Sequence, residues 1–451
     1  MQSELLFKEA PVWQAVGTLV GPSVLSVLVM VIYNMTDLFF IGLLKDTAQT
    51  AAVSVVGPVF TLASAGATVL GMGGCAVVAN SLGAGDRQDA RCVSSLCGWC
   101  ALLTGTFLAV VLNLFCEPIL YMLGTNAEIL PYATHYLRIL ALGAPAMIFS
   151  VSAASLLRAD GAIRRGLAGN LAGSITNILL DPLFILIFGW NIAGAAAATM
   201  LGNLVASGIY LHHILYRSEV LSLSPSHALH TPTRLSRVLA LGLPNGVSSL
   251  LSGLAGSFSN RLLAAYGTNA LAAMAAADKS AKVVTLGQMG VCMGLQPLLA
   301  YNVGGHNLPR LRAVLSRTFG LTTGFGTAFA LVCLLAQRPL IGLFLSDPEA
   351  IFLARQLLPW LLAGSPLLGL YYLSINFLQA TGYAGSATLL SALRQGVLLL
   401  PALYGFHSLL GLPGLAVARA ATDLFSTVIA LLLFLLVWRK LTSDILLRTC
   451  S

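Results

Sequence analysis

The feature that most constrains this chain is a series of long apolar segments that recurs from one end to the other. A hydrocarbon core of about 30 Å is crossed by a helix of roughly 20 apolar residues. We read twelve such segments and predict that each is a membrane-spanning helix: residues 13–43, 51–79, 93–115, 131–157, 163–188, 192–216, 236–265, 271–301, 312–335, 351–380, 384–407 and 412–438. The sequence therefore predicts an all-α polytopic membrane protein.

The composition agrees with a membrane protein and excludes an ordinary soluble domain. Of the 451 residues, 57% are hydrophobic and only 9% are charged, whereas about a quarter of a soluble globular domain is charged. The net charge of +8 would suit nucleic acid if it were gathered in one domain. Because it is spread over short loops between apolar segments, we expect membrane lipids rather than nucleic acid as partners, and a monomer.

The loop charges predict an orientation. With a cytoplasmic N-terminus, most basic residues fall on the inner side, namely Lys8, Arg87, Arg91, Arg164, Arg165, Arg217, Arg234, Arg237, Arg310, Arg312, Arg317, Arg439, Lys440 and Arg448. The outer loops hold chiefly Lys45 and Arg338, beside Asp46, Glu117, Glu128, Asp347 and Glu349. Basic loops stay on the cytoplasmic side of a membrane. We therefore expect a multi-pass protein of the cell inner membrane with both termini in the cytoplasm.

The chain also repeats itself at an offset of 220 to 222 residues. The matching positions are Pro22 with Pro244, Gly74 with Gly294, Gly85 with Gly305 and Gly161 with Gly382. An internal repeat of this length is typical of secondary transporters. We predict two pseudo-symmetric six-helix bundles, an N-terminal lobe over residues 1–215 and a C-terminal lobe over residues 237–451, joined by a cytoplasmic linker over residues 216–236.

The first apolar segment carries a carboxylate in its interior, Asp37. A charge at mid-membrane costs roughly 3 kcal/mol on insertion scales, so such residues usually face a polar interior and serve a function. Tyr33, Asn34 and Met30 lie one to two turns earlier on the same stripe. We predict that this stripe lines an internal substrate cavity.

A second polar stripe runs along the fifth segment. Its members, spaced by four, three and four residues, are Asn170, Ser174, Asn177 and Asp181. This spacing puts them on one face of a helix that is otherwise apolar, and we assign Ser174 to the cavity wall. Pro182 cannot donate to a carbonyl one turn earlier, so we expect a distortion there and a freed backbone oxygen.

Thr199 adds a hydroxyl in the sixth segment. Together with Asp37, Asn177 and Asp181 it would supply the hard oxygen ligands that an alkali cation needs. Buried carboxylates that share a pocket also hold a proton readily. The coupling ion is therefore H⁺, or Na⁺ at Asp37 and Asp181, and we expect no other cofactor. In the alternative interpretation these groups only cross-link helices by hydrogen bonds.

The second half does not repeat the acids. Ser259 lies near the counterpart of Asp37, and Ala402 or a neighbour replaces Asp181. We therefore expect ion coupling in the N-terminal half. The i, i+4 spacings of Asp278 with Lys282 and of Arg419 with Asp423 predict two internal ion pairs, while Arg394 has no obvious partner. Two methionines of the eighth segment are candidate substrate contacts, Met289 and Met293.

Three motifs resemble the multidrug and toxic compound extrusion (MATE) family: YNMTDLFFIG at 33–42, NILLDP at 177–182 and GLQPLLAYNVG at 294–304. The resemblance covers essentially the whole chain. It implies export of organic cations and hydrophobic drugs by alternating access, driven by inward movement of protons or sodium, and no enzyme activity. Its cation site falls on Asp37, Asn177, Asp181 and Thr199, with Tyr136 as a neighbour.

The sequence departs from some members of that family. Ser259 and Asn260 stand where those members have a glutamate, which places this chain nearer the bacterial branch that keeps its acids in the N-terminal lobe. A flippase for a lipid-linked substrate would share the fold, but more cationic cavity residues are expected there. A membrane-embedded enzyme that binds magnesium and pyrophosphate would cluster its aspartates at a membrane face, whereas these are single and deep.

Overall fold

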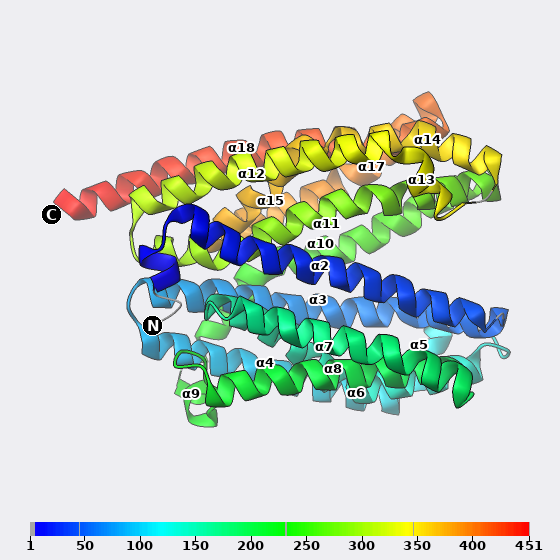
Figure 1. Ribbon diagram of the computed structural model, residues 1–451, viewed down its shortest axis with the longest axis horizontal. Helices are drawn as coiled ribbons and strands as arrows, with labels where there is room; N and C mark the ends of the chain where they lie inside the picture. The colour runs from blue at the N-terminus through cyan, green and yellow to red at the C-terminus, as the bar shows by residue number, and fades with distance from the viewer. Residues whose placement is uncertain (1–4, 45, 231, 346, 451) are drawn as a thin grey trace. The chain divides into compact units, whose positions relative to one another are not determined.

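The computed structural model describes residues 5–44, 46–230, 232–345 and 347–450, and its helices are labelled in Figure 1. Lys45, which the expected outer-loop charge includes, lies outside these ranges. The chain divides into two compact units, one of residues 1–6 and 25–242 and one of residues 7–24 and 243–451. Each unit has its own core, so the two are described separately.

The first unit is a bundle of long helices that pack along their lengths. Its elements are α3 (Thr47–Gly83), α4 (Arg87–Leu114), α5 (Cys116–Met122), α6 (Leu130–Ala159), α7 (Ile163–Pro182), the π-helix η2 (Leu183–Ile187), α8 (Asn191–Tyr216) and α9 (Pro225–His230). Helix α6 packs against α3, α4 and α8, and α7 packs against α8. Buried aliphatic side chains fill the core, among them Ile41, Val56, Leu137, Ile185 and Ile192.

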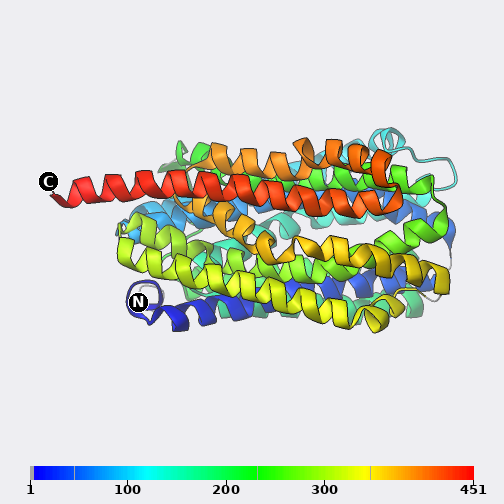
Figure 2. The ribbon, with the colours of Figure 1, turned by 90° about the horizontal axis from the view of Figure 1, so that it is seen from above.

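The second unit is built in the same way. Its elements are α11 (Thr268–Gly304), α12 (Leu308–Leu335), α13 (Gln337–Gly342), α14 (Pro348–Ala363), α15 (Ser365–Ala380), α16 (Ala384–Ala392), the π-helix η3 (Leu393–Val397), α17 (Leu399–Leu410) and α18 (Leu412–Cys450). Helix α11 packs against α12, α14 and α15, and α18, drawn in red in Figure 2, packs against α15 and α17. The core includes Leu263, Met274, Leu357, Leu403 and Leu415.

Two helices, and a short π-helix at the N-terminus, are divided between the units. The boundary falls inside α2 (Val12–Leu43), between residues 24 and 25, and inside α10 (Arg234–Ala264), between residues 242 and 243. The π-helix is η1 (Leu5–Glu9). The two compact units therefore have other boundaries than the predicted lobes. The main difference is that residues 7–24, which we assigned to the N-terminal lobe, group with the second unit. The lobe boundaries at 215 and 237 stay a prediction.

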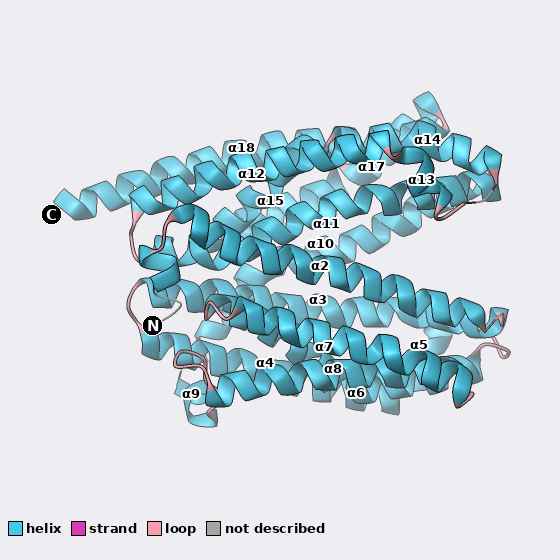
Figure 3. Cartoon of the chain, viewed as in Figure 1, coloured by secondary structure: helices cyan, strands magenta, loops and turns pink. Residues whose placement is uncertain are grey.

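The membrane-spanning segments follow the predicted ones closely. Among the described residues, eleven single helices are long and apolar enough to cross a membrane, and α14 with α15, bent by 44°, makes a twelfth when the two are taken as one span. Every regular element of the described residues is a helix (Figure 3). The one span that differs is residues 351–380, which we predicted as a single helix and which breaks at Gly364.

Packing explains the break at Gly364. A Cβ atom at this position would lie 2.9 Å from Cβ of Asp423 on α18, so only glycine allows this approach. Pro366 follows two residues later and lacks the N–H that a continuous helix would use. The chain therefore ends one helix and begins another where α18 presses against it.

Caps and short segments hold the ends of the first unit. Asp46 caps α3, accepting hydrogen bonds from the backbone N of Ala48 at 2.9 Å and from Nε2 of Gln49 at 2.9 Å. The hydrogen bonds from Gln49 hold the pKa of Asp46 below its usual value. The predicted linker contains helix α9, which packs against α4. Trp99 donates to the linker carbonyl of Leu223 at 3.0 Å.

Candidate functional site

A polar cluster lies between α7 and α8 in the first unit. Asn177 and Asp181 come from consecutive turns of α7, and Thr199 comes from α8. Their exposed fractions are 1%, 0% and 8%, so this cluster is nearly closed to solvent. The structure thus brings together three of the four residues that we predicted for the cation site.

The amide of Asn177 connects the other two side chains. With its nitrogen turned toward Asp181, it donates to Oδ2 at 3.0 Å, and its oxygen accepts from the backbone N of Thr199 at 3.1 Å and from its Oγ1 at 3.3 Å. This orientation satisfies both ends of the amide, whereas the reverse orientation leaves the amide oxygen facing a carboxylate. Asn177 therefore holds one oxygen of Asp181 in place.

Asp37 lies on α2, in the part of this helix that belongs to the first unit. It is half-buried, and its Oδ1 is buried with no hydrogen-bond partner among the described residues. It is close enough to Asp181 for their charges to interact. An unpartnered buried oxygen is costly unless a proton or a cation satisfies it. The two carboxylates have the chemistry to hold a proton or a small cation, and the cation site itself stays a prediction.

Two tyrosines lie beside the acids. Tyr33, one turn before Asp37, is close enough to both carboxylates for their charges to affect it. Tyr136 of α6 is 8% exposed and is also within electrostatic reach of both carboxylates. The polar cluster thus draws on α2, α6, α7 and α8, and the position predicted for Tyr136 from family resemblance is next to it.

Close helix packing makes the cluster possible. A Cβ atom on Gly202 of α8 would lie 2.7 Å from the carbonyl oxygen of Gly173 and 3.3 Å from Cβ of Asn177. Small residues at such a crossing let two backbones approach. The Gly173–Gly202 crossing sets α7 against α8 one turn from Asn177, which explains how the amide reaches Thr199.

The distortion predicted at Pro182 takes the form of a π-helix. Helix α7 ends at Pro182 and continues as η2, which closes with a hydrogen bond from the backbone N of Phe188 to the oxygen of Leu183 at 2.9 Å. A π-turn absorbs the missing donor of proline without ending the span. The freed carbonyl oxygen that we expected from Ile178 stays a prediction.

The residues predicted for the substrate cavity differ in their surroundings. Ser174 is buried on α7, Met30 is 39% exposed, and Asn34 is exposed. Met289 and Met293 lie half-buried on α11 in the second unit. Of these cavity residues, Tyr33 and Tyr136 lie against the acids; the cavity itself stays a prediction.

The positions that match the acids are neutral in the second unit. Ser259 is 1% exposed, and its hydroxyl has no hydrogen-bond partner among the described residues. Ala402 is half-buried on α17. Neither provides a charge, so the carboxylate pair belongs to the first unit.

The predicted ion pairs of the second unit need a correction. Asp278 and Lys282 pair as expected, at 2.9 Å. Arg419 does not pair with Asp423, one turn later on α18, but contacts Asp278 of α11. Asp423 instead accepts from Nε of Arg394 at 2.8 Å, so Arg394 has a partner after all. Spacing along one helix failed because these side chains point toward neighbouring helices.

Sequence reasoning missed one member of the polar region in the first unit. Asn203 donates from Nδ2 to the carbonyl oxygen of Thr199 at 2.9 Å, and its own oxygen accepts from Ser150 of α6 at 3.2 Å. It holds the turn that carries Thr199. The signal was present, because Asn203 lies four residues after Thr199 and so on the same helical face.

Comparison with known proteins gives one consistent picture. The model of the family described as MatE matches residues 22–183 and 244–404. The chain is 30% identical over 442 residues to "Multidrug export protein MepA" of Staphylococcus aureus (strain N315), with 97% of each chain covered. It is 28% identical over 438 residues to the protein of the same name from Staphylococcus saprophyticus, again with 97% of each covered.

Solved structures share the fold. A crystal structure of MATE in complex with MaL6 is similar with a TM-score of 0.93 and 22% identity, over 98% of this chain and 100% of that one. An outward-facing multidrug resistance MATE family transporter of the MOP superfamily is similar with a TM-score of 0.92 and 22% identity, over 98% and 99%. The predicted fold class is thereby confirmed.

Proposed function

The chain belongs to the MatE family, and from this premise we propose that it exports organic cations and other hydrophobic drugs in exchange for an inward-moving proton or sodium ion. The names of its relatives from Staphylococcus support drug export. The single observation that supports coupling to a cation is the pair of neighbouring carboxylates in the first unit, the fully buried Asp181 and the half-buried Asp37.

The site suggests how a cation is held. Asp181 has one oxygen fixed by Asn177, while Oδ1 of Asp37 has no partner among the described residues. A proton on either carboxylate, or a sodium ion between them, would relieve their repulsion and satisfy the open oxygen. Binding and release of one cation would therefore change the charge of the site by one unit.

This charge change provides a simple exchange cycle. In the outward-facing state the cation binds at Asp37 and Asp181 and displaces the drug; the reset protein then faces inward and releases the cation. Where the drug is itself an organic cation, occupancy of the carboxylates by one ligand disfavours the other. A shared or nearby negative charge is enough to couple the two movements.

The loop charges support a location for the protein. Basic side chains crowd the loops on one side, whereas the loops on the other side hold few of them, chiefly Lys45 and Arg338. We assign the basic side to the cytoplasm, which puts both termini inside the cell, in a multi-pass protein of the inner membrane. Cysteine labelling of each loop in intact cells tests this assignment.

The test of the function is gradient-driven export by purified protein in proteoliposomes. Efflux of a fluorescent organic cation is measured under an imposed proton gradient and, separately, a sodium gradient. We expect one gradient to drive efflux, and Asp37→Asn to reduce it to the level of empty liposomes. Asp347→Asn makes the same chemical change at an exposed helix cap and keeps efflux. Near-normal efflux by folded Asp37→Asn protein would reject the proposal.

A further inference from the structure

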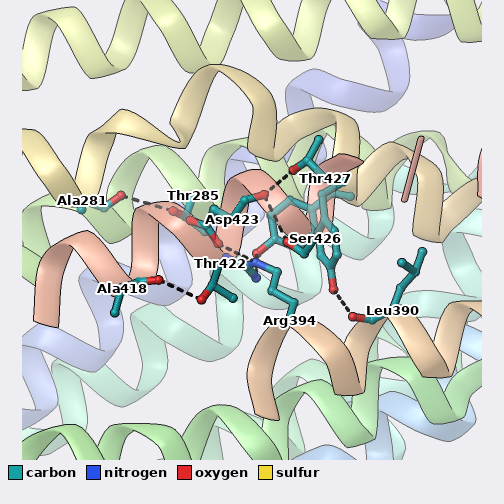
Figure 4. A network of polar contacts seen from close by, with 11 residues as sticks. Ala281, Thr285, Leu390, Arg394, Ala418, Thr422, Asp423, Ser426 and Thr427 are labelled. Carbon is teal, nitrogen blue, oxygen red and sulfur yellow. Dashed lines mark hydrogen bonds and ion pairs between the residues drawn. The ribbon is translucent and has the colours of Figure 1, made fainter. Parts of the chain in front are cut away.

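The second unit holds a buried ion pair that the exchange cycle does not use. Arg394 lies on the π-helix η3 and points toward Asp423 of α18, as Figure 4 shows. Nε of Arg394 donates to Oδ1 of Asp423 at 2.8 Å, and the two side chains are 11% and 15% exposed. Both side chains are thus largely removed from solvent, and each keeps a small exposed fraction.

Most hydrogen-bonding capacity of this arginine is unused. A guanidinium carries five N–H donors in a planar fork. Its Nη1 lies 3.4 Å from the hydroxyl of Tyr372, and Nη2 has no hydrogen-bond partner among the described residues. The rings of Tyr371 and Tyr372 lie 5.0 and 5.6 Å from the guanidinium carbon. The aromatic rings hold the fork in position and leave its terminal edge for another acceptor.

The repeat shows that the fold itself does not require these charges. At the repeat offset, Arg394 corresponds to Gly173 and Asp423 to Gly202. In the first unit those two glycines touch, with a Cβ on either one 2.7 Å from the other's oxygen. An uncharged crossing therefore serves the same place in the fold.

Stability does not explain the ion pair either. Replacing a buried pair with apolar residues is often neutral or stabilising, because desolvation offsets the attraction. The pair also coincides with a π-helix, a distortion that occurs often at functional sites. A charge inside the membrane with a local backbone distortion indicates a binding role.

The surrounding charges leave a positive excess. Asp278 of α11 accepts from both Arg419 and Lys282, so it compensates two cations. Asp423 compensates Arg394. The positive excess of this group of charges thus lies at Asp278, while Asp423 balances Arg394 one to one.

We propose that Arg394 recognises the carboxylate of zwitterionic drugs. The terminal edge, Nη1 and Nη2, matches the two oxygens of a carboxylate. Oδ2 of Asp423, which has no hydrogen-bond partner among the described residues, would lie beside the drug's amine. The second unit thereby selects carboxylate-bearing substrates, and the first unit couples transport to the cation. This inference rests on the proposed export function and adds a residue that determines substrate class.

The test compares two dyes that differ only in this carboxylate: a rhodamine methyl ester, which is a cation, and its free acid, which is a zwitterion. Binding of each to purified full-length protein is measured by fluorescence polarisation, so the result does not depend on transport. We expect Arg394→Gln to weaken binding of the acid about tenfold while binding of the ester changes less than about threefold. Arg338→Gln removes an exposed arginine and is expected to change neither.

A second variant is needed because Arg394→Gln leaves the carboxylate of Asp423 without its positive partner, which could disturb folding. Arg394→Gln with Asp423→Asn removes both charges together, and the same loss of preference for the acid is expected. An unchanged acid-to-ester ratio in either folded variant overturns the proposal, as does wild-type protein that binds only the ester or neither dye. Binding of both dyes by wild-type protein without gradient-driven efflux would instead count against the export function and leave this site standing.

Discussion

In the first unit the buried charge is a pair of carboxylates, Asp37 and Asp181, whereas in the second it is an ion pair of Arg394 with Asp423. Each unit is neutral where the other is charged. Ser259 and Ala402 stand at the positions of the acids, and two glycines stand at the positions of the ion pair. The difference teaches that the repeat preserves the path of the backbone and not the chemistry carried on it.

Both units also contain close helix crossings, at nearby though not identical positions of the repeat. In the first unit a Cβ on Gly73 of α3 would lie 1.9 Å from the oxygen of Val238, near the start of α10. In the second unit a Cβ on Gly294 of α11 would lie 3.0 Å from the oxygen of Leu19, near the start of α2. Both units thus hold the beginning of one divided helix against a glycine. Backbone packing is shared, so the charges were free to diverge.

The strongest test of this division of roles is Asp181→Asn. We expect gradient-driven transport to fall at least about a hundredfold, or about 2.7 kcal/mol, because an amide neither takes up a proton nor balances a cation's charge. Efflux from proteoliposomes measures it, with thermal unfolding of the purified variant as the check on folding.

A transplant sharpens the result. Ala402→Asp places a carboxylate at the matching position of the second unit, and in the Asp181→Asn background it is expected to restore nothing, because Asn177 and Thr199 have no equivalents around it. Restored efflux would show that a carboxylate in either unit can couple transport, and would contradict the division of roles between the units.

The next largest effect is expected from the glycine crossing that replaces the ion pair in the first unit. Gly173→Ala puts a Cβ 2.7 Å from the oxygen of Gly202, and overpacking of this kind typically costs about 1–3 kcal/mol. Thermal unfolding in detergent measures the loss. Gly208→Ala is the matched control, since nothing lies within 4 Å of a Cβ at that position of α8. Equal melting temperatures for the two variants would contradict the packing argument.

Much of this architecture could be predicted from the sequence because it depends on local patterns. Apolar length predicts the spans, and the intervals between Asn177 and Asp181 predict a shared helical face. Burial of those residues follows, because a polar stripe on an apolar helix must face the interior. The spacing of residues within each helix was therefore enough to predict which side chains lie near the acids.

The rest depends on contacts between distant segments. Gly364 breaks a span because Asp423, 59 positions later in the chain, packs against it. Arg394 and Asp423 lie 29 residues apart, and nothing in the spacing of α18 shows that its charges point toward η3 and α11. Spacing within one helix predicted the pair of Asp278 with Lys282 correctly and assigned Arg419 to the wrong partner, because side chains choose among all neighbours and not only those on their own helix.

The smallest expected effect concerns Lys282 and Arg419, the two cations that pair with Asp278, which we expect to differ in their contribution to stability. Lys282 is 62% exposed and Arg419 is 26% exposed. Exposed pairs contribute little, so Lys282→Gln is expected to change stability by no more than about 0.5 kcal/mol. Arg419→Gln removes a donor from a half-buried carboxylate between two helices and is expected to cost about 1.5–3 kcal/mol.

Thermal unfolding of both variants and of the double variant decides between two views of this cluster. If Arg419 is the structural partner and Lys282 a solvated neighbour, the double variant unfolds close to Arg419→Gln alone. If both cations stabilise Asp278, the double variant loses clearly more stability than either single variant, because the carboxylate is then left without a positive partner. That second outcome would mean that Lys282, although 62% exposed, also stabilises the carboxylate of Asp278.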